Sequence, residues 1–249
     1  GVLYPIILHR LLPVIGFGWS VRVIGFICLA TLIIPNVVMK MRVLPAAHRK
    51  LIDWSAWSEA PYVLYSIGGA LSFMGLYVPF FYVQAFAISE RVVNENLGFY
   101  LLSVLNAASV FGRIIPNFIA DKTGPMNVII PCSLVSGILT LCLIPVHNAG
   151  GIIVFCILYG FFSGALVSIA PTVLVTLSPN RGIIGTRMGM SFVVFAIGVL
   201  IGSPIAGAIL TAASFRDVWI FGGLSTIVGS LIMAGARVAK MGWKVKVKG

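Results

Sequence analysis

The chain alternates long apolar runs with short polar stretches. Each run has about the 20 residues that an α-helix needs to cross roughly 30 Å of hydrocarbon. The runs are apolar on every face, whereas a membrane-spanning strand alternates apolar and polar residues over about ten positions. The pattern therefore predicts an all-α, polytopic membrane protein with seven transmembrane helices. We place them at residues 19–39, 61–88, 97–120, 128–146, 150–177, 188–212 and 218–236.

Composition and charge narrow the class of protein. Hydrophobic residues make up 59% of the chain and charged residues 9%, against roughly 25% charged residues in ordinary soluble domains. The net charge of +11 does not indicate nucleic-acid binding, because the basic residues lie between and after the apolar runs. The four cysteines lie within apolar runs without CxxC spacing, and no nucleotide-binding or catalytic motif occurs. We therefore expect no metal, no cofactor and no enzymatic activity.

The distribution of basic residues predicts the orientation in the membrane. Lys and Arg are enriched in cytoplasmic loops, and twelve of them lie at one set of helix ends against four at the other. The first set is therefore expected to face the cytoplasm, together with the connector at residues 40–60 and the basic tail at 238–249. The twelve are Lys40, Arg42, Arg49, Lys50, Lys122, Arg181, Arg187, Arg237, Lys240, Lys244, Lys246 and Lys248, and the four are Arg10, Arg22, Arg91 and Arg216.

The two ends of the chain suggest an architecture of two helical bundles, of which this sequence holds only part. Residues 1–39 are expected to hold the last turns of one helix and one complete helix, and residues 61–237 a six-helix bundle. Residues 5–22 resemble residues 204–219, roughly 200 positions further on, as two tandem six-helix bundles would. Chance similarity between Trp-rich loops is the alternative. We expect that most of the first bundle is missing from this sequence.

A short motif gives the chain a family resemblance. Residues 117–124, Asn-Phe-Ile-Ala-Asp-Lys-Thr-Gly, resemble the G-x-L-a-D-r-x-G signature of the major facilitator superfamily, with Asn117 in place of the first glycine. Residues 105–113, 159–164 and 202–207 resemble the monocarboxylate-porter branch of that superfamily, especially its fungal members. The resemblance covers nearly the whole chain. It implies the C-terminal portion of a twelve-helix transporter, with helices six to twelve and the end of helix five.

Arg113 is the charged residue inside the apolar run at 97–120. An ion at this depth costs roughly 2.5 to 3.5 kcal/mol, which makes it a candidate functional residue. It lies eight residues before Asp121, about 12 Å from the expected hydrocarbon edge. The resemblance implies an arginine beside the path of an anionic substrate, and a guanidinium fits a carboxylate. The alternative is an arginine that snorkels to the headgroups or pairs with a group in the missing half.

Three more residues are candidates for the substrate site. Asn106 lies on nearly the same helical face as Arg113, and Tyr82 lies near the outer end of the helix at 61–88. The resemblance implies that Phe162 belongs to an aromatic region beside the substrate. A hydrogen bond to a neighbouring helix is the alternative for Asn106, and simple packing is the alternative for Phe162.

Proton coupling is left open by the sequence. In the resembling family, members that move monocarboxylates with protons usually have an aspartate one turn before the arginine, where this chain has Ser109. No Asp or Glu lies within a predicted span. Either the missing half carries the proton, or the protein is a uniporter or moves a different organic solute.

Two further groups of residues are expected to serve gating and packing. Asp121, with Lys122 and Gly124, is expected to form a latch that meets the N-terminal end of a neighbouring helix and releases when the cytoplasmic side opens. A charged loop residue that holds the topology is the alternative for Asp121. Close helix packing, or bending at proline, is expected at Pro79, Gly160, Gly164, Gly202, Pro204 and Gly207.

The sequence thus predicts a secondary-active or facilitative transporter of a small organic anion, a monocarboxylate or related solute, that works by alternating access in the plasma membrane. Its expected partners are the solute, membrane lipids and the N-terminal half of the same protein, together with a proton if transport is proton-coupled. A heptahelical receptor is one alternative, although the final span has no lysine for a retinal Schiff base. A non-functional transporter fragment is the other.

Overall fold

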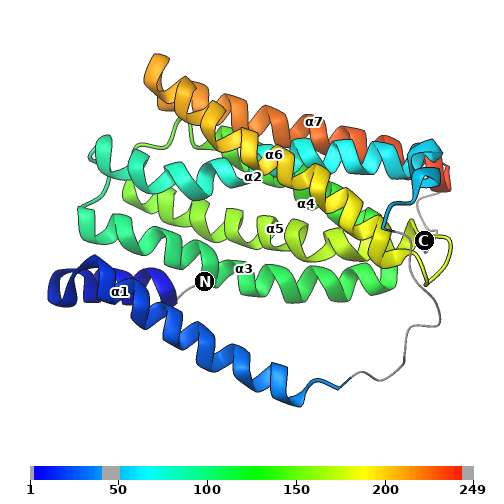
Figure 1. The fold of residues 1–249 in the computed structure, drawn as a ribbon. Coiled ribbons are helices and arrows are strands. Elements are labelled where there is room, and N and C mark those ends of the chain that lie inside the picture. The colour runs from blue at the N-terminus through cyan, green and yellow to red at the C-terminus, as the bar shows by residue number, and fades with distance from the viewer. Residues whose placement is uncertain (1–2, 41–50, 243–249) are drawn as a thin grey trace. The chain divides into compact units, whose positions relative to one another are not determined.

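The computed structural model describes residues 3–40 and 51–242. All regular elements within these residues are helices, and seven of them are long and apolar enough to cross a membrane. The predicted all-α class and the seven helices are confirmed. The elements are α1 (Leu3–Val38), the 3₁₀-helix η1 (Trp54–Ser58), α2 (Ala60–Ser89), α3 (Glu95–Thr123), α4 (Pro125–Cys142), α5 (Ala149–Thr176), α6 (Ile184–Ala212) and α7 (Phe215–Met241) (Figure 1).

The contacts divide the chain into two units, Gly1–His48 and Arg49–Gly249. The first contains α1, in which Gly16 has a non-helical backbone with φ 73° and ψ 171°. The hydropathy pattern predicts a complete helix only from residue 19 onward, but the structure is helical on both sides of Gly16. A positive φ is easily adopted by glycine, so the chain bends at this one residue. The Ser20 hydroxyl donates to the Gly16 carbonyl at 2.7 Å.

The six helices of the second unit begin and end within five residues of the predicted boundaries. Helix α4 ends at Cys142, whereas the apolar run continues to Val146. Proline disfavours helical backbone in the residue before it, and Pro145 lies within this stretch. Hydropathy could not show this end, because the residues after Cys142 are as apolar as those before it.

Helix α2 lies at the centre of the second unit. It packs most extensively on α7 and then on α6, while α3 packs on α5, and α4 packs on α7 and α5. Glycine makes these close contacts possible. A Cβ atom at Gly75 would overlap the Gly222 carbonyl oxygen of α7, and one at Gly198 would overlap the Ala70 carbonyl oxygen of α2. Small residues let the helix backbones approach, as in other membrane bundles.

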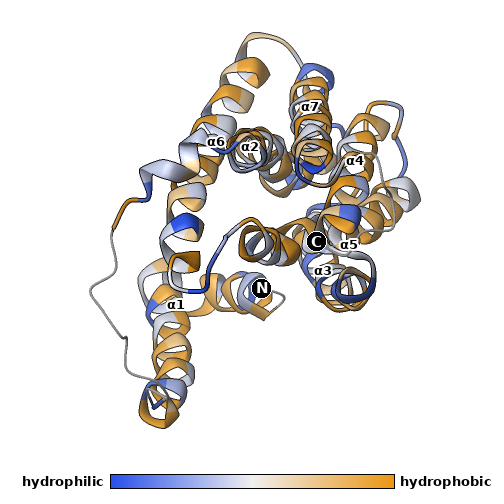
Figure 2. Ribbon diagram, turned by 90° about the vertical axis from the view of Figure 1, so that its right-hand side faces the viewer, coloured by the Kyte–Doolittle hydropathy of each residue, from blue (hydrophilic) through white to orange (hydrophobic). Residues whose placement is uncertain are grey.

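Helices α3 and α6 are the least buried helices of the second unit. In their most apolar stretches 33% and 22% of residues are buried, against 44% to 56% in the other four helices. Figure 2 shows hydrophobic residues along most of each helix of this unit. Both helices therefore present wide apolar faces that lie outside the core of the bundle.

Candidate functional site

Arg113 lies on the exposed side of α3. Its guanidinium makes no hydrogen bond or ion pair with any residue in the described part of the chain. Exposed apolar residues lie beside it, with Val110 and Ile114 49% and 51% exposed, while Ser109 and Asn117 lie one turn away on either side. Among the described residues, the Arg113 charge therefore has no partner, about 12 Å along the helix from Asp121.

Two asparagines share the side of α3 on which Arg113 lies. The Asn106 amide nitrogen donates to the Leu102 carbonyl at 2.8 Å, so one of its two donors is used within its own helix. The Asn117 amide nitrogen donates to the Arg113 carbonyl at 2.5 Å and to the Ser168 hydroxyl of α5 at 2.8 Å. Asn117, which replaces the first glycine of the family signature, thus joins α3 to α5.

The other two predicted substrate residues lie elsewhere in the bundle. The Tyr82 hydroxyl donates to the Ser203 carbonyl at 3.0 Å and links α2 to α6. Phe162 packs edge-on against Phe161, with ring centroids 5.3 Å apart. No described contact brings either residue together with Arg113, so a single site containing all four predicted residues stays a prediction.

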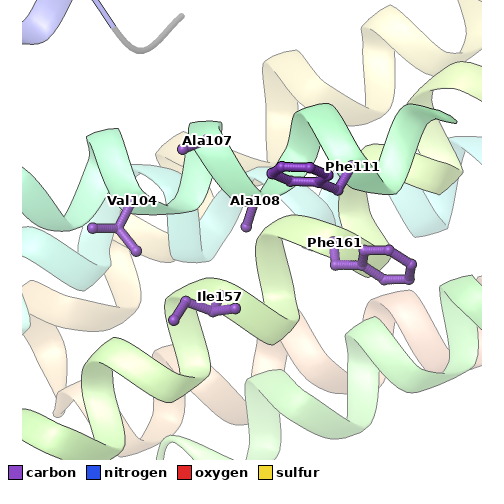
Figure 3. Close-up of a pocket in the computed structure, with 6 residues that line it drawn as sticks. All are labelled: Val104, Ala107, Ala108, Phe111, Ile157 and Phe161. Carbon is purple, nitrogen blue, oxygen red and sulfur yellow. The ribbon is translucent and has the colours of Figure 1, made fainter. Parts of the chain in front are cut away.

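A cavity of about 370 Å³ opens between α3 and α5. Figure 3 shows its lining side chains, none of which is polar. Phe111 lies two residues before Arg113, and two residues correspond to about 200° around an α-helix. The cavity therefore lies on the side of α3 away from Arg113. Its lining residues are Val104, Ala107, Ala108, Phe111, Ile157 and Phe161.

A second cavity, of about 390 Å³, opens between α2 and α6. Its lining is dominated by aromatic rings and carries one hydroxyl group, that of Tyr77. This cavity also contains none of the four predicted substrate residues. It is lined by Phe73 and Tyr77 of α2 and by Phe192, Phe195, Ala196, Val199 and Leu200 of α6.

The predicted latch lies at the junction of α3 and α4. Gly124 is the single residue between the two helices, and its φ of 96° is one that favours glycine. Asp121 and Lys122 lie in the last turn of α3, are exposed, and form no ion pair with a described residue. Negative charge at a helix C-terminus is electrostatically unfavourable. The structure thus gives Gly124 a clear role in the turn, and no residue in the described part of the chain pairs with the Asp121 carboxylate.

The residues predicted for packing or bending lie inside helices. A Cβ atom at Gly160 would overlap the Leu105 carbonyl oxygen, and one at Gly202 would overlap the Met74 carbonyl oxygen. Gly164 lies against Ser109, and Gly207 lies against the Tyr82 hydroxyl. Pro79 lies within α2 and Pro204 within α6. Bending at these prolines remains a prediction.

Sequence reasoning missed an ion-pair cluster in which a buried arginine, Arg187, meets two partly exposed carboxylates. Arg187 is 1% exposed, and its Nε lies 2.8 Å from Asp53 Oδ2. Its two Nη atoms lie 2.8 and 2.5 Å from the two carboxylate oxygens of Glu59, and Nη1 also donates to the Leu177 carbonyl at 3.1 Å. The Tyr62 ring lies 5.6 Å from the guanidinium carbon, and the Tyr62 hydroxyl donates to the Arg187 carbonyl.

This cluster, the Arg187 clamp of Arg187, Asp53 and Glu59, joins three parts of the second unit at one end of the bundle. Asp53 caps η1, Glu59 caps α2, and Leu177 follows α5. Hydrogen bonds from Ser55 and Arg187 hold the pKa of Asp53 below its usual value, and hydrogen bonds from Arg187 do the same for Glu59. Both carboxylates are therefore charged near neutral pH.

The sequence contained one signal for the clamp. Asp53 and Glu59 lie in a connector predicted on the same side of the membrane as the start of α6, where Arg187 had been counted only as an orientation signal. Opposite charges at one membrane face can pair. Several arginines are predicted on that face of the membrane. The packing of α2, α5 and α6 decides which of them is buried, and the sequence alone does not show that packing.

Seven helices that are long and apolar enough to cross a membrane identify an integral, multi-pass membrane protein. Comparison with known proteins then shows that it is homologous to fungal MFS-type transporters, which supports its place in the major facilitator superfamily. The chain is 47% identical over 236 residues to the MFS-type transporter dbaD of Emericella nidulans, covering 94% of this chain and 53% of the relative. No protein-family model matches the chain.

Two further relatives are named as efflux proteins. The aspyridones efflux protein apdF of Emericella nidulans is 35% identical over 240 residues, 96% of this chain and 49% of the relative. The agnestins efflux protein of Paecilomyces divaricatus is 37% identical over 250 residues, 99% of this chain and 57% of the relative. The chain thus spans about half the length of the curated relatives it matches.

We expect Arg187→Lys to lower the thermal stability of the purified protein, because an ammonium group cannot bridge both carboxylates and the Leu177 carbonyl. Lysine keeps the positive charge but loses the planar fork that contacts Asp53 and Glu59 at the same time, and solvent screens part of the loss because the Glu59 side chain is 43% exposed. Melting followed by tryptophan fluorescence in detergent measures the effect. Arg181→Lys, at an exposed arginine with no described partner, is the control and is expected to melt like the parent. Equal melting of all three proteins would contradict the clamp.

The clamp also predicts a dependence of stability on pH. Folding lowers the pKa of Asp53 and Glu59 from usual values of 3.8 and 4.5. Their contribution is therefore present above the usual values and is lost as the pH falls through the lowered ones. Melting temperatures between pH 7 and pH 3, measured for the parent and for Asp53→Asn/Glu59→Gln, should converge at the acid end. A constant difference across this range would show that the carboxylate charges do not stabilise the fold.

Proposed function

We propose that this chain is the C-terminal portion of a major facilitator superfamily transporter of the monocarboxylate-porter-like branch. In this assignment α1 holds the end of helix five and helix six, and α2 to α7 are helices seven to twelve. The matches to about half of each relative support it. Arg49–Gly249 corresponds to the C-terminal bundle, and an N-terminal half completes the solute pathway.

We propose further that the transporter moves a small organic anion, a monocarboxylate or related solute, by alternating access. The observation that carries this proposal is the Arg113 guanidinium, which lies on the exposed face of α3 and pairs with no described residue. An arginine this deep is costly in lipid and typically faces protein or a water-filled path. Its planar fork binds a carboxylate through two parallel hydrogen bonds. Asn106, on the same side of α3, is proposed to contribute its remaining donor.

The names of the relatives support a proposal for the direction of transport and for the membrane. Two of them are named as efflux proteins, which favours export and hence a place in the plasma membrane. The apolar interiors of the described spans contain no Asp or Glu, since Glu95, Asp121 and Asp217 lie in the end turns of their helices. A coupled proton would therefore be carried by the N-terminal half.

Asp121 is proposed to latch the cytoplasmic mouth of the pathway. Its carboxylate is exposed at the unfavourable end of its own helix, so the positive N-terminal end of another helix would stabilise it. Lys122 lies at the favourable end, and Gly124 fixes the turn that presents both residues. Opening of the mouth would break the Asp121 contact.

We expect Arg113→Lys to reduce transport at least tenfold, because a lysine keeps the charge and loses the bidentate geometry. The full-length protein is reconstituted in liposomes, and uptake of radiolabelled lactate, acetate and benzoate is measured against the amount of inserted protein. Arg181→Lys is the matched control. Unchanged uptake by Arg113→Lys would remove this residue from the solute site, and flux of none of the acids through the parent would overturn the anion assignment.

We expect Asp121→Asn to change the maximal transport rate by severalfold while the substrate concentration at half-maximal rate stays nearly constant. An amide cannot make the charged contact with a helix end, so the inward-closed state is destabilised without loss of a substrate contact. The same liposome assay, run over a range of acid concentrations, separates the two parameters. Loss of apparent affinity at a normal maximal rate would argue against a latch.

A further inference from the structure

The cavity between α2 and α6 is built from aromatic rings in defined contact. Phe73 and Phe195 stack with centroids 5.2 Å apart and an interplanar angle of 14°. The ring centroid of Tyr77 lies 6.4 Å from that of Phe73. The Phe192 ring is edge-on to the Phe195 ring, with centroids 5.7 Å apart. The rings come from two helices and line an open depression of about 390 Å³. Small-molecule pockets range from about 300 to 1,000 Å³, so this space suits one ring system of modest size.

The Tyr77 hydroxyl is the polar group of this lining. Three fully buried tyrosines of the same unit, Tyr62, Tyr65 and Tyr159, each donate to a backbone carbonyl of another helix or segment. Tyr77 is partly exposed, and its hydroxyl makes no hydrogen bond with a described residue. A tyrosine needed only for packing would be served equally well by phenylalanine. The hydroxyl is therefore available to a bound molecule.

The aromatic face of α2 is turned away from α7. Gly75 packs against Gly222 of α7, and Tyr77, two residues later, projects about 200° away around the helix. On that side Phe80 meets Tyr159 of α5, with centroids 6.0 Å apart. The cavity therefore lies on the flank of α2 between α5 and α6.

The cavity and Arg113 lie at similar depth along their helices. Phe192 is eight residues into α6, or about 12 Å from its start. Arg113 is ten residues from the end of α3, or about 15 Å. The α6 start and the α3 end belong to the same end of the bundle, because the helices alternate in direction.

We propose that the α2–α6 cavity binds a planar aromatic group of the transported solute. The inference rests on the proposed transport function and narrows its substrate class to aromatic organic anions. Stacked and edge-on ring contacts favour a flat aromatic partner beyond the burial of apolar area, and the Tyr77 hydroxyl offers one hydrogen bond to a ring substituent. A lipid acyl chain would fill the same space without using either feature.

Equilibrium binding to the purified full-length protein tests the cavity apart from transport. The probes are radiolabelled 1-naphthol and its saturated analogue decahydro-1-naphthol, which share a hydroxyl and differ in aromaticity. We expect saturable binding of 1-naphthol, weakened about three- to tenfold by Phe192→Leu, with little change for the saturated alcohol. Tyr77→Phe should weaken 1-naphthol binding as well. Phe192 is 38% exposed at the rim, so its replacement spares the core.

The matched control is Phe111→Leu, at the rim of the α3–α5 cavity, which should leave 1-naphthol binding unchanged. Three results would overturn the inference: no saturable binding of 1-naphthol, an equal loss of binding in Phe192→Leu and Phe111→Leu, or an equal effect of Phe192→Leu on the binding of both alcohols. The third result would indicate a site for lipid acyl chains. Because 1-naphthol is uncharged, these outcomes do not depend on Arg113. Failure of organic-acid flux with intact 1-naphthol binding would instead overturn the anion assignment alone.

Discussion

The high cost of an unpaired charge in an apolar environment governs the placement of charge in this bundle. Two arginines meet that constraint in opposite ways. Arg187 is buried, and two carboxylates and a carbonyl satisfy its guanidinium within the second unit. Arg113 lies on the exposed side of α3 and has none of these partners among the described residues. The bundle itself satisfies the charge of the first arginine, whereas in our proposal the solute and the other half of the pathway satisfy the charge of the second.

Much of the fold could be predicted because a membrane helix is recognised by length and hydropathy alone. The helices were therefore found, while their ends depended on finer backbone chemistry. Gly16 bends α1 at one residue because of its φ angle, and the apolar run after Cys142 is not helical ahead of Pro145. Neither feature changes the hydropathy of the chain. Sequence patterns therefore located the helices well, but they did not locate the residues at which a helix bends or ends.

The candidate site was less accessible to sequence reasoning. Arg113 stood out because one charge in an apolar run is visible without any tertiary information. The pairing of Arg187 with Asp53 joins residues 134 positions apart, and the stacking of Phe73 on Phe195 depends on the register of two helices. The Tyr82 hydroxyl, predicted for the solute, donates to the backbone of α6, and its role at the solute site stays a prediction. Contacts between helices therefore decided which polar and aromatic groups were already occupied.

The Arg187 clamp has a mechanical consequence. Asp53 and Glu59 hold the segment that leads into α2 against the first turn of α6, and the Leu177 carbonyl adds the end of α5. A force applied to the chain before residue 53 is therefore distributed over the start of α2, the start of α6 and the end of α5. It does not act on α2 alone. Force entering through the connector would tilt this part of the bundle as a block.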